Sequence, residues 1–199
     1  YCGHALSQTG GHGDMRGPGE GGVEHCFCCA GLGRICDGVA EVRRAARDEI
    51  RKGAHHIKIM ASGGVSSPTD RITSTQFSME EMVAIVEEAQ AAGIYVMAHA
   101  YTPKAIVRAV DAGVRSVEHG NLLDEESATR LLEAGTFLVP TIIATHALAD
   151  QGLEAGLPRN MVEKVFEVRD AGLRALEIAH RRGVRMAFGS DLLGALHDR

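Results

Sequence analysis

Short apolar runs alternate along this chain with longer segments of helical periodicity. The runs are rich in Val, Ile and Met and show little alternation of apolar and polar positions, which is typical of strands covered on both faces. The expected strands are 55–60 (HHIKIM), 94–99 (IYVMAH), 114–119 (VRSVEH), 136–143 (TFLVPTII) and 184–189 (VRMAFG).

The segments between these runs predict helices with recognisable ends. Ser78 and Glu81 in SMEE fit a capping box, and glycine follows several helical segments in AAG, DAG, EAG and RRG. The stretch up to about residue 38 is Gly-rich and predicts irregular structure, and a longer loop is expected after residue 143. The expected helices are about 38–52, 78–92, 103–112, 124–134 and 160–182.

The repeated order of strand, loop, helix and glycine predicts an α/β fold with a parallel sheet and helices outside it. The turns from helix to strand are short, whereas the loops from strand to helix are longer and carry polar residues. Such loops form the active face of a (β/α)8 barrel, while a doubly wound sheet gathers its site at one switch point. Because polar residues end four different strands, we expect one domain over 1–199 with a TIM-type (β/α)8 barrel.

Four polar residues close these apolar runs and predict one shared site. Lys58 lies in the run HHIKIM, His99 ends IYVMAH, His119 ends VRSVEH and Asp191 follows VRMAFG-Ser. An ionisable side chain at a buried strand is costly unless something pairs with it. An amine, two imidazoles and a carboxylate suit a metal centre that performs hydrolysis, with Asp191 as ligand and proton acceptor.

Lys58 lies between Ile57 and Ile59, so its side chain points away from theirs and toward the barrel interior, as does that of Met60. Burial lowers the pKa of an amine, and a neutral amine can react with carbon dioxide to give a carbamate that bridges two cations. The alternative is a lysine that reaches the rim and keeps its ammonium in water.

Simpler roles stay open for the other candidates. Either imidazole of the predicted centre could be a hydrogen-bonded structural histidine, and Asp191 could cap a following helix. His12, in the GGHGD loop, is a candidate substrate contact, and His146 is a candidate for the mouth of the site.

Composition excludes several classes of function. The chain has 199 residues, 45% of them hydrophobic, and its 26 acidic residues outnumber 21 Lys and Arg, which argues against nucleic-acid binding. No apolar run approaches the ~18 residues that would span a membrane. There is no signal peptide at the N-terminus, which predicts a cytoplasmic protein, although the absence of an initial Met indicates a fragment and leaves a secreted form open.

The five cysteines favour free thiols in a reducing compartment, because their number is odd. A zinc knuckle is the alternative, built from His25 and the cluster Cys26, Cys28, Cys29 and Cys36, but the paired C-x-x-C spacing is missing.

The ordered motifs resemble the amidohydrolase superfamily, and more narrowly its imidazolonepropionase-related branch, which includes metal-dependent Xaa-Pro dipeptidases (prolidases) and Xaa-Arg carboxypeptidase-like enzymes. They extend over nearly the whole chain. The motifs are TGGHGD (9–14), HIKIMASGGV (56–65), MAHAY (97–101), VEHG (117–120), VPT (139–141) and FGSD (188–191).

The resemblance implies a (β/α)8 barrel with one or two divalent metals, often zinc. It implies that Lys58 is a carboxylated bridging lysine ending strand 4, and that His99 and His119 are ligands ending strands 5 and 6. Asp191 would end strand 8 as metal ligand and proton shuttle, and Tyr101 and His12 would contact the substrate. The H-x-H pair that the family carries at strand 1 is missing, so we expect strands 3–8 without strands 1–2 and the small β-domain.

The leading hypothesis is therefore a metal-dependent hydrolase of amide or peptide bonds that acts on a dipeptide or an N-acyl amino acid. A cyclic-amide hydrolase is the nearest alternative. A second alternative, of another enzyme class, is an aldolase-type enzyme that forms a Schiff base on Lys58. A third alternative is a non-catalytic barrel remnant. The expected partners are a small-molecule substrate and a second copy of the chain, with no nucleic acid or membrane.

Overall fold

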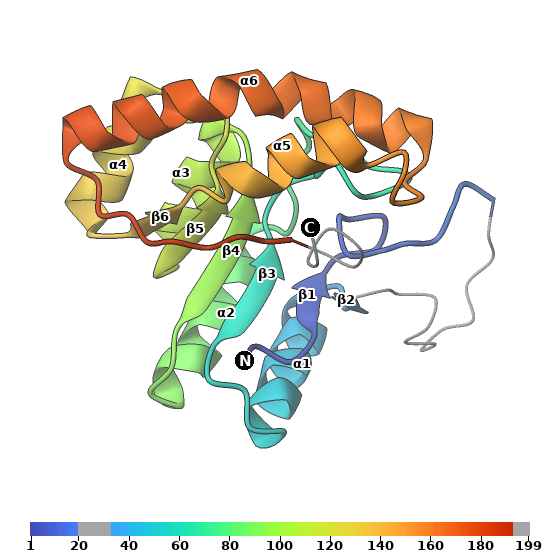
Figure 1. Cartoon of the computed structure of the whole chain (residues 1–199). Helices are drawn as coiled ribbons and strands as arrows, with labels where there is room; N and C mark the ends of the chain where they lie inside the picture. Colours follow the sequence, from blue (N-terminus) through green and yellow to red (C-terminus); the bar gives the residue numbers. More distant parts are fainter. Residues whose placement is uncertain (20–32, 193–199) are drawn as a thin grey trace.

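The computed structural model describes residues 1–19 and 33–192, which form a six-stranded parallel sheet with helices beside it (Figure 1). The strands follow the order β2-β1-β3-β4-β5-β6, and every neighbouring pair is parallel. This arrangement confirms the predicted α/β class. The strands are β1 (Ala5–Ser7), β2 (Gly33–Ile35), β3 (Ile57–Met60), β4 (Val96–Ala100), β5 (Ser116–His119) and β6 (Phe137–Val139).

Successive helices pack side by side along the sheet, α1 on α2, α2 on α3 and α3 on α4, while α6 packs on α4 and α5. Figure 1 shows α6 crossing the upper end of the sheet, with α5 beside it. No described helix has both the length and the apolar character needed to cross a membrane. The helices are α1 (Val39–Arg51), α2 (Met79–Ala91), α3 (Pro103–Ala112), α4 (Glu125–Ala134), α5 (Ile142–Gln151) and α6 (Arg159–Arg182).

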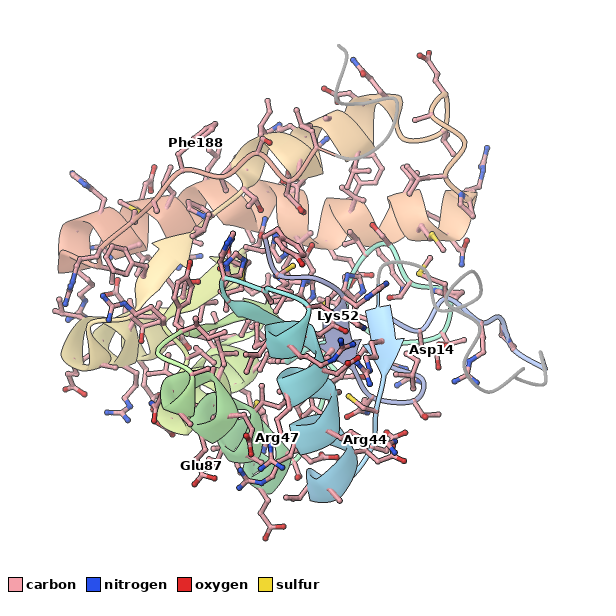
Figure 2. The ribbon with its side chains drawn as sticks, turned by 90° about the horizontal axis from the view of Figure 1, so that it is seen from below. Asp14, Arg44, Arg47, Lys52, Glu87 and Phe188 are labelled. Carbon is pink, nitrogen blue, oxygen red and sulfur yellow. The ribbon has the colours of Figure 1, made fainter. Side chains whose placement is uncertain are left out.

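The larger of two buried hydrophobic clusters lies between the sheet and the helices. Ile57 and Ile59 of β3 are fully buried in it, together with Ile85 of α2 and Ile106 of α3. Such burial of apolar side chains is the main favourable term in folding. At the outer edge of the core, α1 and α2 are also joined by ion pairs, including Arg47 with Glu88; Figure 2 shows Arg47 at this boundary.

The predicted helix ends are confirmed. Ser78 caps α2 by accepting from the backbone N–H of Glu81, whose carboxylate accepts in return from the backbone N–H of Ser78. Gly113 and Gly135 end α3 and α4 in the left-handed conformation that glycine adopts without strain.

The prediction of irregular structure before residue 38 was wrong in part, because β1 and β2 both lie there. Each is only three residues long, too short for periodicity to reveal. The zinc knuckle considered as the alternative to free thiols falls mainly on His25, Cys26, Cys28 and Cys29, which lie outside the described residues. Cys2 and Cys36 are free thiols.

The apolar run 136–143 was predicted as one strand, but β6 ends at Val139 and α5 begins at Ile142. The chain turns at Thr141, which has a left-handed φ of 46°, so the helix occupies part of the predicted loop. Short apolar runs fit a buried strand and a buried helix equally well, which explains the error.

The predicted strand 184–189 is reduced to one parallel bridge between Leu138 and Met186. Its backbone still follows β6, since the N–H of Ala187 donates to the carbonyl of Leu138. No second strand lies on its other side within the described part of the chain. Phe188 is consequently 91% exposed and projects outward from this segment (Figure 2).

Replacing Ser78 with Ala should lower the free energy of unfolding by about 1 kcal/mol, because an N-terminal N–H of α2 loses its acceptor. Urea denaturation measures the change. Ser78→Asp is the matched control, since a carboxylate caps equally well. A loss in the Asp variant as large as that in the Ala variant would contradict the capping role.

Candidate metal centre and active-site cavity

The four predicted centre residues line one cavity of about 280 Å³. Lys58, His99, His119 and Asp191 reach it from β3, β4, β5 and the segment after α6. Tyr101 and His12, the predicted substrate contacts, also line it. The carboxyl ends of parallel strands therefore deliver these groups to one place, as expected for this class of fold.

Lys58 points into the cavity because side chains alternate along β3. Its neighbours Ile57 and Ile59 are buried against the helices, whereas Lys58 and Met60 are only partly buried and both line the cavity. Burial lowers the pKa of Lys58, and the carboxylates of Glu118 and Asp191 oppose that shift. A lowered pKa favours the neutral amine that carbamate formation requires.

His99 is buried and held in one tautomer. Its Nε2 lies 3.0 Å from the carbonyl oxygen of Gly63, which can only accept, so Nε2 carries the proton and donates. The Nδ1 lone pair is then left for another partner. Burial holds the pKa of His99 well below its usual value, so the ring is neutral and suited to bind a cation.

His119 is oriented by a neighbouring threonine. Its Nδ1 is hydrogen-bonded with Oγ1 of Thr141 at 2.7 Å, which leaves Nε2 without a hydrogen-bond partner among the described residues. Burial again holds the pKa of His119 well below its usual value. The ring centroids of His99 and His119 lie 4.7 Å apart.

Asp191 lies beside this pair, with Oδ2 3.9 Å from Nδ1 of His119. Its side chain is 47% exposed, and partial burial raises its pKa while Lys58 opposes the shift. A carboxylate with a raised pKa is a better proton acceptor. The helix that Asp191 was alternatively expected to cap would lie outside the described residues.

Backbone strain is concentrated at this site. Among the described non-glycine residues, positive φ values occur at Phe77, His119, Thr141 and Asp191, and three of these four belong to the centre or orient it. A β-branched residue such as Thr141 adopts this conformation only at a cost. Strain of this kind persists where the surrounding structure enforces it, and it clusters at functional sites.

The two predicted substrate contacts flank the imidazoles. His12 stacks on His99 with centroids 4.2 Å apart, and the ring of Tyr101 meets His99 edge to face at 4.9 Å. Burial lowers the pKa of His12 to about 4 and raises the pKa of Tyr101. At neutral pH the wall therefore offers a neutral imidazole and a neutral phenol.

The cavity does not include His146, which was predicted at the mouth. Its neighbours on α5, Ala144, Thr145 and Leu148, line the cavity instead. The hydrogen bond from Arg169 lowers the pKa of Asp170 of α6, and His146 lies near enough to add to that shift. His146 was a candidate because of its residue type. The direction of its side chain is set by helix α5, in a segment that was expected to be a loop.

Sequence reasoning missed Glu118. It is 5% exposed, on the strand face that Ser116 shares, and its Oε1 accepts from the Ser116 hydroxyl at 2.6 Å. Burial raises the pKa of Glu118, and Lys58 opposes the shift. A glutamate inside an apolar run was a visible signal, because unpaired acidic residues are almost never fully buried.

A second group that the sequence did not reveal is the loop 61–77, which α6 holds in place. Lys164 donates to the carbonyls of Gly64, Ser67 and Asp70 at 3.2, 2.9 and 2.8 Å. Because this loop also contains Gly63, the contact ties α6 to the residue that orients His99.

The donor set fits a divalent cation in type but is not complete. Two neutral imidazoles each keep one ring nitrogen free, and a carboxylate and an amine lie in the same cavity. Across residues 1–19 and 33–192, however, no three His, Cys, Asp or Glu side chains converge closely enough to hold a metal ion by themselves. Four ligands are the usual number for zinc.

Serial βα units that bring imidazoles, an amine and a carboxylate together at the strand ends define an α/β protein of the barrel class. The chain belongs to the amidohydrolase family, whose model matches residues 2–197. The six parallel strands are accordingly an incomplete (β/α)8 barrel, as the motifs predicted.

Three relatives show how far the similarity extends. A prolidase crystallised with N-methylphosphonate-L-proline is 56% identical with a TM-score of 0.94, over 98% of this chain and 48% of that one. A Xaa-Pro dipeptidase with bound methionine is 32% identical with a TM-score of 0.83, over 96% and 47%. Ochratoxinase from Aspergillus niger is 40% identical over 95% of this chain. The chain spans about half the length of these relatives, and 41% of ochratoxinase.

Replacing Lys164 with Met should lower the free energy of unfolding by about 1.5–3 kcal/mol, because carbonyls of the loop 61–77 lose a charged donor. Urea denaturation measures this change. Lys104→Met is the matched control, since Lys104 is exposed on α3. Equal stability of the two variants would show that the clamp contributes nothing.

Proposed function

We propose that the natural protein carrying this chain is a divalent-metal-dependent hydrolase of amide bonds in small substrates. The observation that carries the proposal is the convergence of Lys58, His99, His119 and Asp191 in one cavity. The similarity to a prolidase and to ochratoxinase supports it. Zinc is the expected cation, because imidazole and carboxylate are its usual ligands.

In this proposal His99 offers Nδ1 and His119 offers Nε2, the ring nitrogens that their hydrogen bonds leave free. Lys58 would react with carbon dioxide and release a proton, and the resulting carbamate would offer its two oxygens as ligands. A bound divalent cation would supply Lewis-acid chemistry, lowering the pKa of water and polarising the substrate carbonyl. The remaining ligands would come from the H-x-H pair that this sequence lacks.

Asp191 performs the proton transfers in the proposed mechanism. Its carboxylate accepts a proton from the attacking water and then gives it to the leaving nitrogen, so the amide becomes an acid and an amine. Partial exposure lets the side chain turn between these positions, and its raised pKa suits both roles.

The rest of the cavity would bind the substrate. The neutral phenol of Tyr101 can donate to a substrate carboxylate, and both Tyr101 and His12 contact the ring of His99. Met60, Val65 and Leu148 give the wall apolar character. We therefore propose a dipeptide or an N-acyl amino acid with an apolar side chain as the substrate class.

Asp191→Asn in the natural protein should lower turnover by about 10²–10⁴-fold, the usual contribution of a general base. A panel of Xaa-Pro dipeptides, N-acyl amino acids and cyclic amides measures it. Asp150→Asn is the control, because Asp150 is exposed on α5. Unchanged turnover would remove Asp191 from the mechanism, and turnover of cyclic amides alone would replace the proposed substrate class.

Lys58→Ala should lose bound metal and activity, with partial recovery when short carboxylic acids are added, because they replace the carbamate. Metal analysis and rate measurements test this together, with Lys104→Ala as the control. Full metal content in the Lys58 variant would contradict the bridging role. Trapping of a carbonyl substrate on Lys58 by borohydride would favour the Schiff-base alternative.

A further inference from the structure

His12 belongs to a buried hydrogen-bond relay that has no part in the mechanism proposed above. Its Nδ1 lies 2.9 Å from Oγ of Ser67, and the Ser67 hydroxyl is in turn hydrogen-bonded to Oδ1 of Asp70. Ser67 and Asp70 are both buried. The three side chains thus form a chain from the cavity wall into the loop 61–77.

The direction of the protons in this relay follows from its chemistry. A carboxylate can only accept, so Ser67 must donate its single hydroxyl proton to Asp70. The Ser67 oxygen must then accept from His12, which requires the proton on Nδ1. The ring of His12 is consequently the Nδ1–H tautomer, and its Nε2 is an acceptor.

Neighbouring groups hold every member of the relay in place. Oδ2 of Asp70 accepts from Nε2 of Gln76 at 2.8 Å and from the backbone N–H of Gly64 at 3.2 Å. Oε1 of Gln76 accepts from the backbone N–H of His12 at 2.9 Å, which closes a ring of contacts between the two loops. These bonds leave Asp70 and Gln76 little freedom to rotate.

Gly64 makes the close approach possible. A Cβ at this position would lie 2.1 Å from Cε1 of His12, well inside contact distance. The imidazole therefore lies directly against the backbone of the loop on one side and stacks on His99 on the other. The ring plane is fixed between a peptide and a second imidazole.

We propose that Ser67 and Asp70 are positioning residues that hold His12 as its Nδ1–H tautomer, so that Nε2 presents a hydrogen-bond acceptor to the bound substrate. This inference rests on the proposed function. It adds that the site recognises a donor, an N–H or O–H of the substrate or of the attacking water, at the position facing His12. Hydrogen bonds that orient a metal-binding imidazole typically contribute 10–100-fold in activity, and we expect an effect of the same order for His12.

Nitrogen NMR of the natural protein labelled with ¹⁵N-histidine tests the tautomer directly. The His12 signals are identified by their loss in His12→Gln. We expect a protonated Nδ1 and an unprotonated Nε2 in the wild type, and a changed ratio of the two forms in Ser67→Ala. A wild-type ring protonated on Nε2 would overturn the proposal without any activity measurement.

Kinetics provide the second measurement. Ser67→Ala should lower kcat/KM by about 10–100-fold, and Ser67→Thr, which keeps a hydroxyl, should recover most of it. Thr73→Ala is the matched control in the same loop, since Thr73 is exposed. Wild-type kinetics in Ser67→Ala, or no recovery in a folded Ser67→Thr, would overturn the proposal.

The two proposals fail in different ways. If no amide is hydrolysed but the wild-type ring carries its proton on Nδ1, the proposed function fails and the relay stands. If amides are hydrolysed but Ser67→Ala leaves the tautomer unchanged, the relay fails and the function stands. If Ser67→Ala does not fold, the wild-type spectrum and the kinetics of Ser67→Thr still test the positioning role of Ser67.

Discussion

The parallel register of β3, β4 and β5 is the constraint on which the site depends. Met60 pairs with His99 and Ala100 pairs with His119, so the carboxyl ends of these strands stop at nearly the same level. Alternation along β3 then sends Lys58 into the cavity while Ile59 enters the core. A shift of one residue would exchange these faces and bury the ammonium among helix side chains.

Much of the fold was predictable because local signals and the global fold agree. The capping box at Ser78 and the glycines after α3 and α4 mark boundaries that the structure reproduces within a residue or two. The convergence of Lys58, His99, His119 and Asp191 was predictable for a related reason. A buried polar residue at a strand end is unusual. In a parallel fold, one shared site explains all four of them.

The features that escaped prediction are those determined by contacts between distant segments. β1 and β2 are too short for periodicity, and the start of α5 depends on the turn at Thr141 rather than on the composition of its apolar run. Ser67, Asp70 and Lys164 are ordinary loop and helix residues in the sequence. Only the packing of α6 over the loop 61–77 brings Lys164 to the other two.

The loop 61–77 sets the direction of two imidazoles at once. The carbonyl of Gly63 fixes the tautomer of His99, and the Ser67 hydroxyl engages His12, which stacks on His99. Because Lys164 of α6 donates to three carbonyls of the same loop, a movement of α6 would disturb both rings together. The orientation of the predicted ligands is therefore a property of tertiary packing, while their placement at the strand ends follows from sheet register. The strained conformations of His119, Thr141 and Asp191 point the same way, since isolated segments would not adopt them. A site of this kind keeps its geometry only while the helices beside the sheet stay in place.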